Sequence, residues 1–276
     1  MTLILSALTP THAIQVSDRR FTLPNGELYE DDLNKSLALS CSNGHFCLSA
    51  TGLGKIRGKP TSEWIADIIY AQNKGPFRVI DIAMALKGGL DQVWQSQSKA
   101  QPLTIVGVGV ETSGNTTVPI HLLISNCEPY QRFRGEIARE FVIASSNLPI
   151  GQPLKIRVSG YWPAIRDRTE ETLIWTVRHF RNRNDPSGLM SAFVKVVRMA
   201  SYDPQYGRFI GRNCMGLYVP HLKHSFNINY YPENASPYSK APPMVSKGMR
   251  MYDMVAWQGD KGDWPSDIPI PRPDDV

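Results

Sequence analysis

The chain has 276 residues, of which 42% are hydrophobic, and its 30 Lys and Arg residues against 25 Asp and Glu give a formal net charge of +5 at pH 7. A chain of this length can bury one substantial core, so we expect a single large globular domain. No apolar run approaches the ~20 residues that a membrane-spanning helix needs. The run LILSAL (residues 3–8) is too short for a signal peptide and follows no basic segment. We therefore expect a cytoplasmic protein with no membrane partner.

Metal and cofactor sites are not indicated by the residue pattern. The four cysteines lack the C-x-x-C spacing of zinc and redox sites, which favours buried free thiols at Cys41, Cys47, Cys127 and Cys214. The six histidines show no spacing typical of metal ligands. We expect no metal and no other cofactor.

The densest basic cluster is RHFRNRND, residues 178–185. It follows an amphipathic helical pattern, and cations are favourable at the C-terminal end of a helix. A solvated helix end therefore explains the cluster. Because the chain also lacks a recognisable nucleic-acid-binding module, we do not expect nucleic acid as a partner.

The first half of the chain alternates between two kinds of pattern. Short strand-like segments separated by turn signals occupy residues 3–50 and predict an antiparallel meander. The segment KPTSEWIADIIYAQ then predicts a helix with an apolar stripe. The helical pattern of FRVIDIAMALKGG follows, and we expect Gly88 and Gly89 to end it.

The second half repeats this order. Strand patterns appear in PLTIVGVGVE, VPIHLLIS and EFVIASS. A helix is predicted at DRTEETLIWTVRHF, where Asp167 and Glu170 have the spacing of a capping box. The next predicted helix has Asp185 as its N-cap and Pro186 at its first position. A strand at RFIGRNCMGLYVP closes this part of the chain.

Grouped strands and helix pairs favour antiparallel sheets with helices outside them over a βαβ parallel sheet. We therefore predict an α+β fold in which two antiparallel sheets face each other, with helices at about 61–97 and 169–200 on opposite outer faces. We assign residues 1–220 to this domain. Residues 221–276 are rich in Pro and aromatic residues, and we expect an extended tail packed on the domain or on a partner.

The first fifty residues also carry a motif. Thr2 is followed sixteen residues later by Asp18 in VSDRR, Lys35 stands seventeen residues further on, and SATGLG places Thr51 and Gly52 before the first predicted helix. These spacings and the block order resemble proteasome β-subunits and their bacterial relatives in the N-terminal nucleophile (Ntn) hydrolase superfamily. The resemblance covers residues 2–220. It implies a four-layer αββα sandwich, a peptide or other amide as substrate, and a homo-oligomer.

The chemistry of these residues agrees with the resemblance. A hydroxyl is a weak nucleophile, but a Thr at the N-terminus can use its own α-amine as the base. That amine has a reference pKa of about 7.7 to 8.0. Lys35 beside it would lower the pKa by like-charge repulsion, and Asp18 would keep Lys35 charged and oriented. The N–H of Gly52 would stabilise the oxyanion. This use of Thr2 requires removal of Met1, since an acylated nitrogen is no base.

Two further stretches bear on the resemblance. RVSGYW supplies Ser159 where the family has a Ser before a Gly. GRNCMG places Asn213 and Met215 where the family has an Asp and a Ser that orient the terminal amine. Asn carries no charge and a thioether is only a weak acceptor, so this departure bears directly on activity.

Alternative interpretations need no active site. Each residue then has a structural role: Thr2 as a polar residue of an edge strand, Asp18 as a turn acid pairing with Arg19 or Arg20, Lys35 as a solvated strand end, and Gly52 as a turn glycine. Three functions stay open. They are a threonine-type Ntn hydrolase, a catalytically silent proteasome-like scaffold, and a basic nucleic-acid-associated protein with an unrelated fold.

Overall fold

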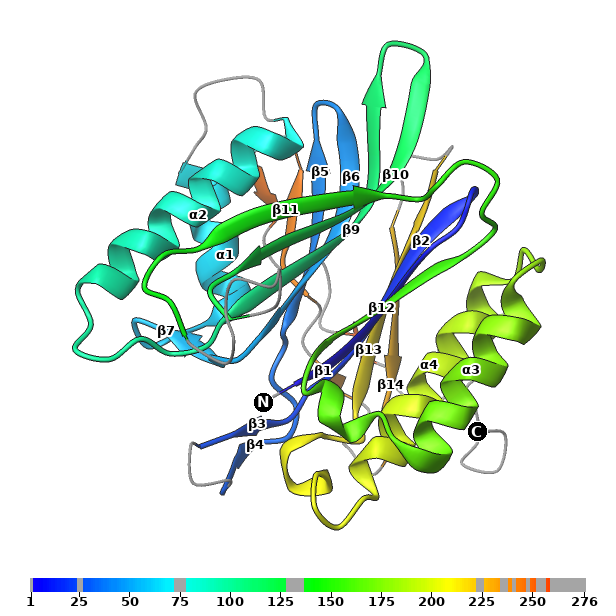
Figure 1. Ribbon diagram of the computed structural model, residues 1–276. Helices are drawn as coiled ribbons and strands as arrows, with labels where there is room; N and C mark the ends of the chain where they lie inside the picture. Colours follow the sequence, from blue (N-terminus) through cyan, green and yellow to red (C-terminus); the bar gives the residue numbers. More distant parts are fainter. Residues whose placement is uncertain are drawn as a thin grey trace.

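The computed structural model describes residues 2–23, 27–71, 78–127, 137–221, 226–233, 238–239, 242–246, 249–251 and 257–258. The fold is α+β and is built around two large sheets (Figure 1). One sheet has five strands in the order β12-β1-β2-β13-β14, and the other has seven in the order β11-β10-β9-β6-β5-β16-β17. The described part of the chain also contains four α-helices.

The five-stranded sheet is antiparallel throughout. Its strands, in chain order, are β1 (Leu3–Leu8), β2 (His12–Asp18), β12 (Lys155–Gly160), β13 (Cys214–Pro220) and β14 (Asn227–Tyr231). β1 and β2 are buried along their whole length, since both of their faces are covered. The N-terminal strand is therefore an interior strand of the sheet.

The seven-stranded sheet is antiparallel except at one pair. Its strands are β5 (Ser36–Cys41), β6 (Gly44–Thr51), β9 (Thr104–Ser113), β10 (Thr116–Ser125), β11 (Val142–Asn147), β16 (Met244–Ser246) and β17 (Met249–Met251). β16 pairs with β5 in parallel, which departs from the purely antiparallel sheets that we predicted. The parallel partner comes from the last part of the chain, where the sequence pattern signals no strand.

Six short strands form three two-stranded ribbons beside the large sheets. They are β3 (Phe21–Thr22) with β4 (Leu28–Glu30), β7 (Lys55–Ile56) with β8 (Lys59–Pro60), and β15 (Tyr238–Ser239) with β18 (Trp257–Gln258). Beyond Pro220, β14 extends one large sheet and β16 extends the other. This part of the tail is therefore built into the sheets of the domain.

The helices come in pairs. The first pair is α1 (Thr61–Ala71) and α2 (Val79–Gln95), and the second is α3 (Asp167–Phe180) and α4 (Pro186–Ser201). Buried side chains of α1 and α2 form one core with the seven-stranded sheet, and those of α4 form another with the five-stranded sheet. Figure 1 shows the two pairs on opposite sides of the molecule. A third apolar cluster joins Leu8 and Leu217 of one sheet to Cys47 and Val108 of the other.

The helix ends test three predictions. Asp185 is the N-cap of α4, and its carboxylate accepts the N–H of Gly188 at 2.8 Å, as predicted. The capping box at Asp167 and Glu170 is wrong, because α3 already begins at Asp167 and Arg166 is its N-cap.

The predicted end at Gly88 and Gly89 is also wrong, because α2 continues to Gln95. A helical Gly costs about 1 kcal/mol relative to Ala, and burial of Leu90, Val93 and Trp94 outweighs that cost. A side chain at position 89 would crowd Trp64 and Ile68 of α1. None of the described helices combines the length and apolarity needed to cross a bilayer.

Candidate functional site

Thr2 lies directly before β1 and is 3% exposed. Its carbonyl oxygen accepts two hydrogen bonds, from the N–H of Tyr161 at 2.8 Å and from the hydroxyl of Thr51 at 3.1 Å. β1 has β12 on one side and β2 on the other, so the edge-strand interpretation of Thr2 is wrong. The N-terminus is held inside the structure by three separate segments of the chain.

Gly160 allows this close approach. Its φ of +82° lies in the region that favours glycine. A Cβ at this position would lie 2.1 Å from the carbonyl oxygen of Thr2 and 2.6 Å from the hydroxyl of Thr51. The SGY segment therefore needs a glycine at its centre to hold Thr2.

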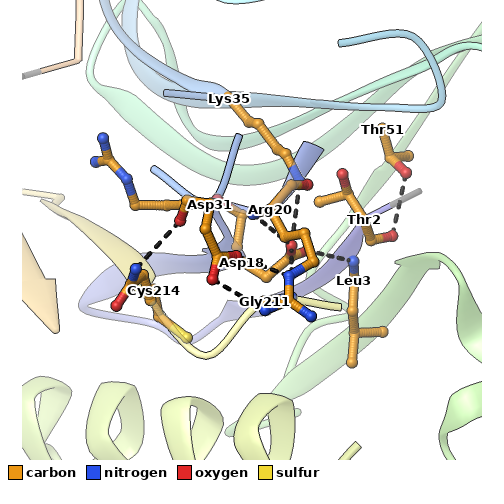
Figure 2. A network of polar contacts seen from close by, with 12 residues as sticks. Thr2, Leu3, Asp18, Arg20, Asp31, Lys35, Thr51, Gly211 and Cys214 are labelled. Atoms are coloured by element: carbon orange, nitrogen blue, oxygen red, sulfur yellow. Dashed lines mark hydrogen bonds and ion pairs between the residues drawn. The ribbon is translucent and has the colours of Figure 1, made fainter. Parts of the chain in front are cut away.

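Asp18 reaches the N-terminus because β1 and β2 pair in antiparallel register, with Ile4 opposite Ser17. One carboxylate oxygen accepts the N–H of Leu3 at 2.8 Å. The other accepts the N–H groups of Arg20 at 3.0 Å and Gly211 at 3.1 Å. Figure 2 shows the carboxylate at the centre of these contacts. The sixteen-residue spacing thus brings a fully buried carboxylate within hydrogen-bond distance of the peptide N–H that follows Thr2.

Lys35 stands directly before β5 and is 5% exposed, so the interpretation as a solvated strand end is wrong. Its ammonium lies 3.1 Å from Oδ2 of Asp18 and also donates to the carbonyl oxygen of Arg20 (Figure 2). Burial lowers the pKa of Lys35, and the charge of Asp18 opposes that shift. Asp18 and Lys35 therefore form a buried ion pair between the two sheets.

The neighbouring arginines pair with other acids. Arg20 forms a bidentate pair with Asp31, with distances of 2.7 and 2.9 Å. The guanidinium of Arg19 is fully buried, 2.6 Å from Asp32. Arg20 donates to Asp18 through its backbone N–H, and the side chains of both arginines pair with other acids, so the interpretation of Asp18 as a turn acid paired with an arginine side chain is wrong. Asp18 is left to face Lys35 and the N-terminus.

A small cavity lies beside Thr2. Its volume is about 10 Å³, and Thr2, Lys35 and Gly52 line it with Phe21, Asn34, Ala50, Leu53, Gly54 and Thr61. Such a volume holds about one water. Gly52 has a φ of +106°, and a Cβ there would lie 2.1 Å from the carbonyl oxygen of Pro102. The site as described is closed to a peptide.

Ser159 is opposite Ile4 in the pairing of β12 with β1. Side chains alternate along a strand, so Thr2, Ile4 and Ser159 share one face of the sheet. The hydroxyl of Ser159 is buried, and it has no hydrogen-bond partner within the described residues. An unpaired buried hydroxyl near the N-terminus can serve as a partner for a terminal amine.

Asn213 and Met215 make their contacts with residues other than Thr2. The Asn213 amide donates to the carbonyl oxygen of Asp31 and accepts the N–H of Glu233, both at 3.1 Å. Met215 belongs to the apolar cluster between the sheets. In this stretch, Gly211 supplies the contact to Asp18 through its backbone. Sequence analysis missed Gly211, Gly160 and Tyr161, since backbone contacts leave no residue-type signal.

A chain of buried hydrogen bonds continues from the site between the sheets. Ser17 and Ser36 are joined at 3.0 Å, Ser36 and Ser49 at 2.8 Å, and Ser49 donates to Gln15 at 2.7 Å. Gln15 in turn donates to the carbonyl oxygen of Val106 at 3.0 Å. Ser17 and Ser36 are the sequence neighbours of Asp18 and Lys35. This series of hydrogen bonds therefore links the two sheets beside the ion pair.

Comparison with known proteins agrees with this architecture. No protein-family model matches the sequence. No curated protein matches it either. Among solved structures, the "Gly-1" mutant of Anbu from Hyphomicrobium sp. strain MC1 superposes with a TM-score of 0.56 at 8% identity, over 85% of this chain and 88% of that one. Anbu, the ancestral beta-subunit from Yersinia bercovieri, superposes with a TM-score of 0.53 at 8% identity, over 84% and 88% of the two chains.

The fold is thus that of proteasome β-subunit-like proteins. Within that class, the structures to which this chain is similar are those of Anbu. The resemblance found in the sequence is confirmed at the level of the fold.

Proposed function

We propose that the protein is a threonine-type Ntn hydrolase that cleaves amide bonds, with a peptide as the substrate class. The observation that supports this most is the buried Asp18–Lys35 pair, which lies against the Thr2–Leu3 peptide in a fold of the Ntn class. A buried ion pair is weak evidence for stability, because desolvation offsets its attraction. Its place beside a hydroxyl residue at the N-terminus is better explained by chemistry.

The proposed reaction begins after removal of Met1. The α-amine of Thr2 takes the proton of the Thr2 hydroxyl while Oγ1 bonds to the substrate carbonyl carbon. The N–H of Gly52 donates to the oxyanion that forms. The proton then passes to the leaving nitrogen, the C–N bond breaks, and an ester remains on Thr2. Water attacks this ester, the α-amine takes its proton, and Oγ1 regains a proton as the acid product leaves.

The other residues act on the amine and its surroundings. The ammonium of Lys35 lowers the pKa of the α-amine by like-charge repulsion, and Asp18 holds Lys35 in place. The hydroxyl oxygen of Ser159 accepts a hydrogen bond from the charged amine, since it has no other partner among the described residues. Thr51 and Tyr161 fix the carbonyl of Thr2 and thereby the direction of its side chain.

The proposal extends to architecture and setting. The two sheets with their helix pairs form the four-layer αββα sandwich of the superfamily, and the protein acts as a homo-oligomer. The free cysteines suit a reducing compartment, so we place it in the cytoplasm. An enclosed assembly would keep an unspecific peptidase away from folded proteins.

A second candidate function is a catalytically silent proteasome-like scaffold. Two observations favour it: the cavity at Thr2 holds about one water, and Asn213 directs its amide toward Asp31 and Glu233. A silent scaffold needs the ion pair only as a link between the sheets. The two candidates differ in what happens at the N-terminus.

The test uses protein released from a cleavable fusion so that Thr2 is the first residue, with intact mass confirming the terminus. Hydrolysis of a broad fluorogenic peptide set is measured for this protein and for its Thr2→Ala and Thr2→Ser variants. We expect no turnover with Ala, retained turnover with Ser, and similar melting curves for all three. Loss of a buried hydroxyl and methyl costs about 1 kcal/mol, whereas loss of the nucleophile removes the acyl-enzyme route.

Equal turnover by wild type and Thr2→Ala would place catalysis elsewhere. Absence of turnover in the processed wild type on every peptide, or Met1 retained in protein purified from its native host, would favour the silent scaffold.

A further inference from the structure

A large cavity lies beside the candidate site, at one end of the five-stranded sheet. It is bounded by the end of the β3–β4 ribbon and by the connection from α4 to β13, which Figure 1 shows at the same end of the molecule. Arg20, whose backbone N–H donates to Asp18, lines it. Its volume is about 670 Å³, as in ligand-binding pockets. It shares no lining residue with the small cavity at Thr2 and is therefore a separate place for a ligand.

Most of the charges around this cavity are neutralised within the protein. Eight of its lining residues are charged, three of them arginines and five of them acids. Six of these eight take part in ion pairs, either with one another or with an arginine outside the cavity lining. The pairs are Arg20–Asp31 at 2.7 Å, Arg19–Asp32 at 2.6 Å, Arg166–Asp203 at 3.0 Å and Arg212–Glu233 at 3.3 Å. A ligand that leaves these pairs intact meets only the two charges that remain.

The two remaining charges are Glu30 and Arg208. Glu30 ends β4, is exposed, and its carboxylate has no ion pair or hydrogen bond within the described part of the chain. Arg208 is also exposed, and its guanidinium lies over the Phe209 ring, 4.6 Å from the centroid, with no acid paired to it among the described residues. Stacking orients a guanidinium and leaves its N–H groups available. The cavity thus offers a ligand one carboxylate and one guanidinium.

The balance of charges favours one class of ligand. A phosphate carries only negative charge, and the acids that line the cavity outnumber its arginines. A metal ion needs several converging ligands, and the described residues contain no group of three His, Cys, Asp or Glu that could hold one. A molecule with one positive and one negative group satisfies both free charges. A short peptide has these groups at its two ends, and the volume is suited to several residues.

We propose that this cavity binds a short peptide through its free termini. The carboxylate of Glu30 accepts hydrogen bonds from the α-ammonium group. The guanidinium of Arg208 donates to the α-carboxylate in the bidentate geometry that these two groups favour. The four ion pairs of the cavity stay closed when the peptide binds. The inference does not depend on the proposed hydrolase activity.

Isothermal titration calorimetry with peptides of defined ends tests this binding. The full chain carries Thr2→Ala, so that no peptide is hydrolysed at Thr2 and the result is separate from the proposed function. The probes are di-, tri- and tetra-alanine with free termini, together with the N-acetylated form and the C-terminal amide of each. We expect binding by the free peptide of at least one length. Acetylation or amidation should each weaken this binding at least about fivefold, because each removes one charge-assisted contact.

Variants then assign each terminus to its residue. Glu30→Gln should weaken binding of the free peptide as much as acetylation does, and should leave the affinity of the acetylated peptide unchanged. Arg208→Gln should show the same relation to the amide. The matched controls are Glu140→Gln and Arg183→Gln, which neutralise exposed charges outside the cavity and should change no affinity. Melting curves should be alike for all four, since these side chains are exposed.

Three results would overturn the proposal. The first is the absence of binding by every peptide of the series. The second is equal affinity for free and blocked peptides, since the termini would then not hold the peptide. The third is a Glu30→Gln variant that weakens free and acetylated peptides alike, because Glu30 would then not contact the α-ammonium group.

Discussion

The ammonium of Lys35 lies 3.1 Å from Oδ2 of Asp18, and both side chains are buried. Asp18 ends β2 of the five-stranded sheet, and Lys35 directly precedes β5 of the seven-stranded sheet. The pair therefore joins the two sheets at the point where Thr2 precedes β1. Three backbone N–H groups complete the surroundings of the carboxylate. The stability of the fold and the proposed chemistry thus depend on the same two charges. Variants of Lys35 and Asp18 can separate the effect on stability from the effect on hydrolysis.

The first prediction compares Lys35→Met with Asp18→Asn. Removal of one partner of a buried ion pair costs about 3 to 5 kcal/mol when the other charge is left uncompensated. After Lys35→Met, Asp18 still has the N–H groups of Leu3, Arg20 and Gly211, so we expect a loss near the lower end of that range. After Asp18→Asn, the amide nitrogen cannot accept these N–H groups, and Lys35 loses its counter-charge. We therefore expect Asp18→Asn to unfold at lower urea concentration.

Urea unfolding of both variants and of the double variant measures this order. The double variant should be less destabilised than the sum of the singles, because the two residues interact directly. Strict additivity, or a larger loss for Lys35→Met, would contradict the central place given to Asp18. Both single variants should also lose peptide hydrolysis if the proposed function is correct.

The second prediction concerns Gly160, with Gly151 as the matched control. Their φ values are +82° and +78°, so Ala at either position meets the same backbone strain of about 1 to 2 kcal/mol. At Gly160 the new Cβ would meet the carbonyl oxygen of Thr2 at 2.1 Å, whereas a Cβ at Gly151 would have no atom beyond its chain neighbours within 4 Å. We expect Gly160→Ala to be the more destabilising by at least 1 kcal/mol in thermal unfolding. Similar losses for both would show that the contact with Thr2 is easily relaxed.

The third prediction concerns the dependence of stability on pH. His121 is 1% exposed, and neither of its ring nitrogens has a hydrogen-bond partner among the described residues. Burial, with smaller contributions from Lys155 and Arg157, lowers the pKa of His121 from 6.5 to about 3. The unfolded chain therefore binds a proton at a higher pH than the folded one. The stability that His121 contributes is complete above about pH 6.5 and is lost as pH falls toward 3.

Replacement of His121 by Leu should remove this loss. Between pH 7.5 and pH 5 the free energy of unfolding should fall by about 2 kcal/mol more in the wild type than in His121→Leu. At pH 7.5 the variant should be at least as stable, because the imidazole gives up no hydrogen bond there. Urea unfolding at the two pH values measures both quantities. Parallel acid losses in the two proteins would mean that His121 is solvated or paired in solution.

Local pattern was sufficient where a segment's structure depends on its own residues. Asp185 and Pro186 begin α4 as predicted, because a cap and a fixed φ act within one turn. The inward side chains Leu189, Phe193 and Val196 are buried, as the helical period implies. Gly88 and Gly89 were misjudged as a helix end because their neighbours Val93 and Trp94 are buried in a core that the pattern does not describe.

By itself the sequence indicated that Asp18 lies near Thr2 and which class of fold holds them. The sixteen-residue spacing of Thr2 and Asp18 corresponds to one antiparallel hairpin, β1 with β2, so spacing alone brings them together. Tertiary structure decided the rest: that β1 is an interior strand, that Lys35 is buried on Asp18, and that Gly211 and Gly160 hold the terminus through backbone atoms. The interior position of β1 and the contacts of Gly211 and Gly160 depend on pairing between segments more than a hundred residues apart. Since the backbone groups that make such contacts are the same in nearly every residue, only the folded chain shows which of them are used.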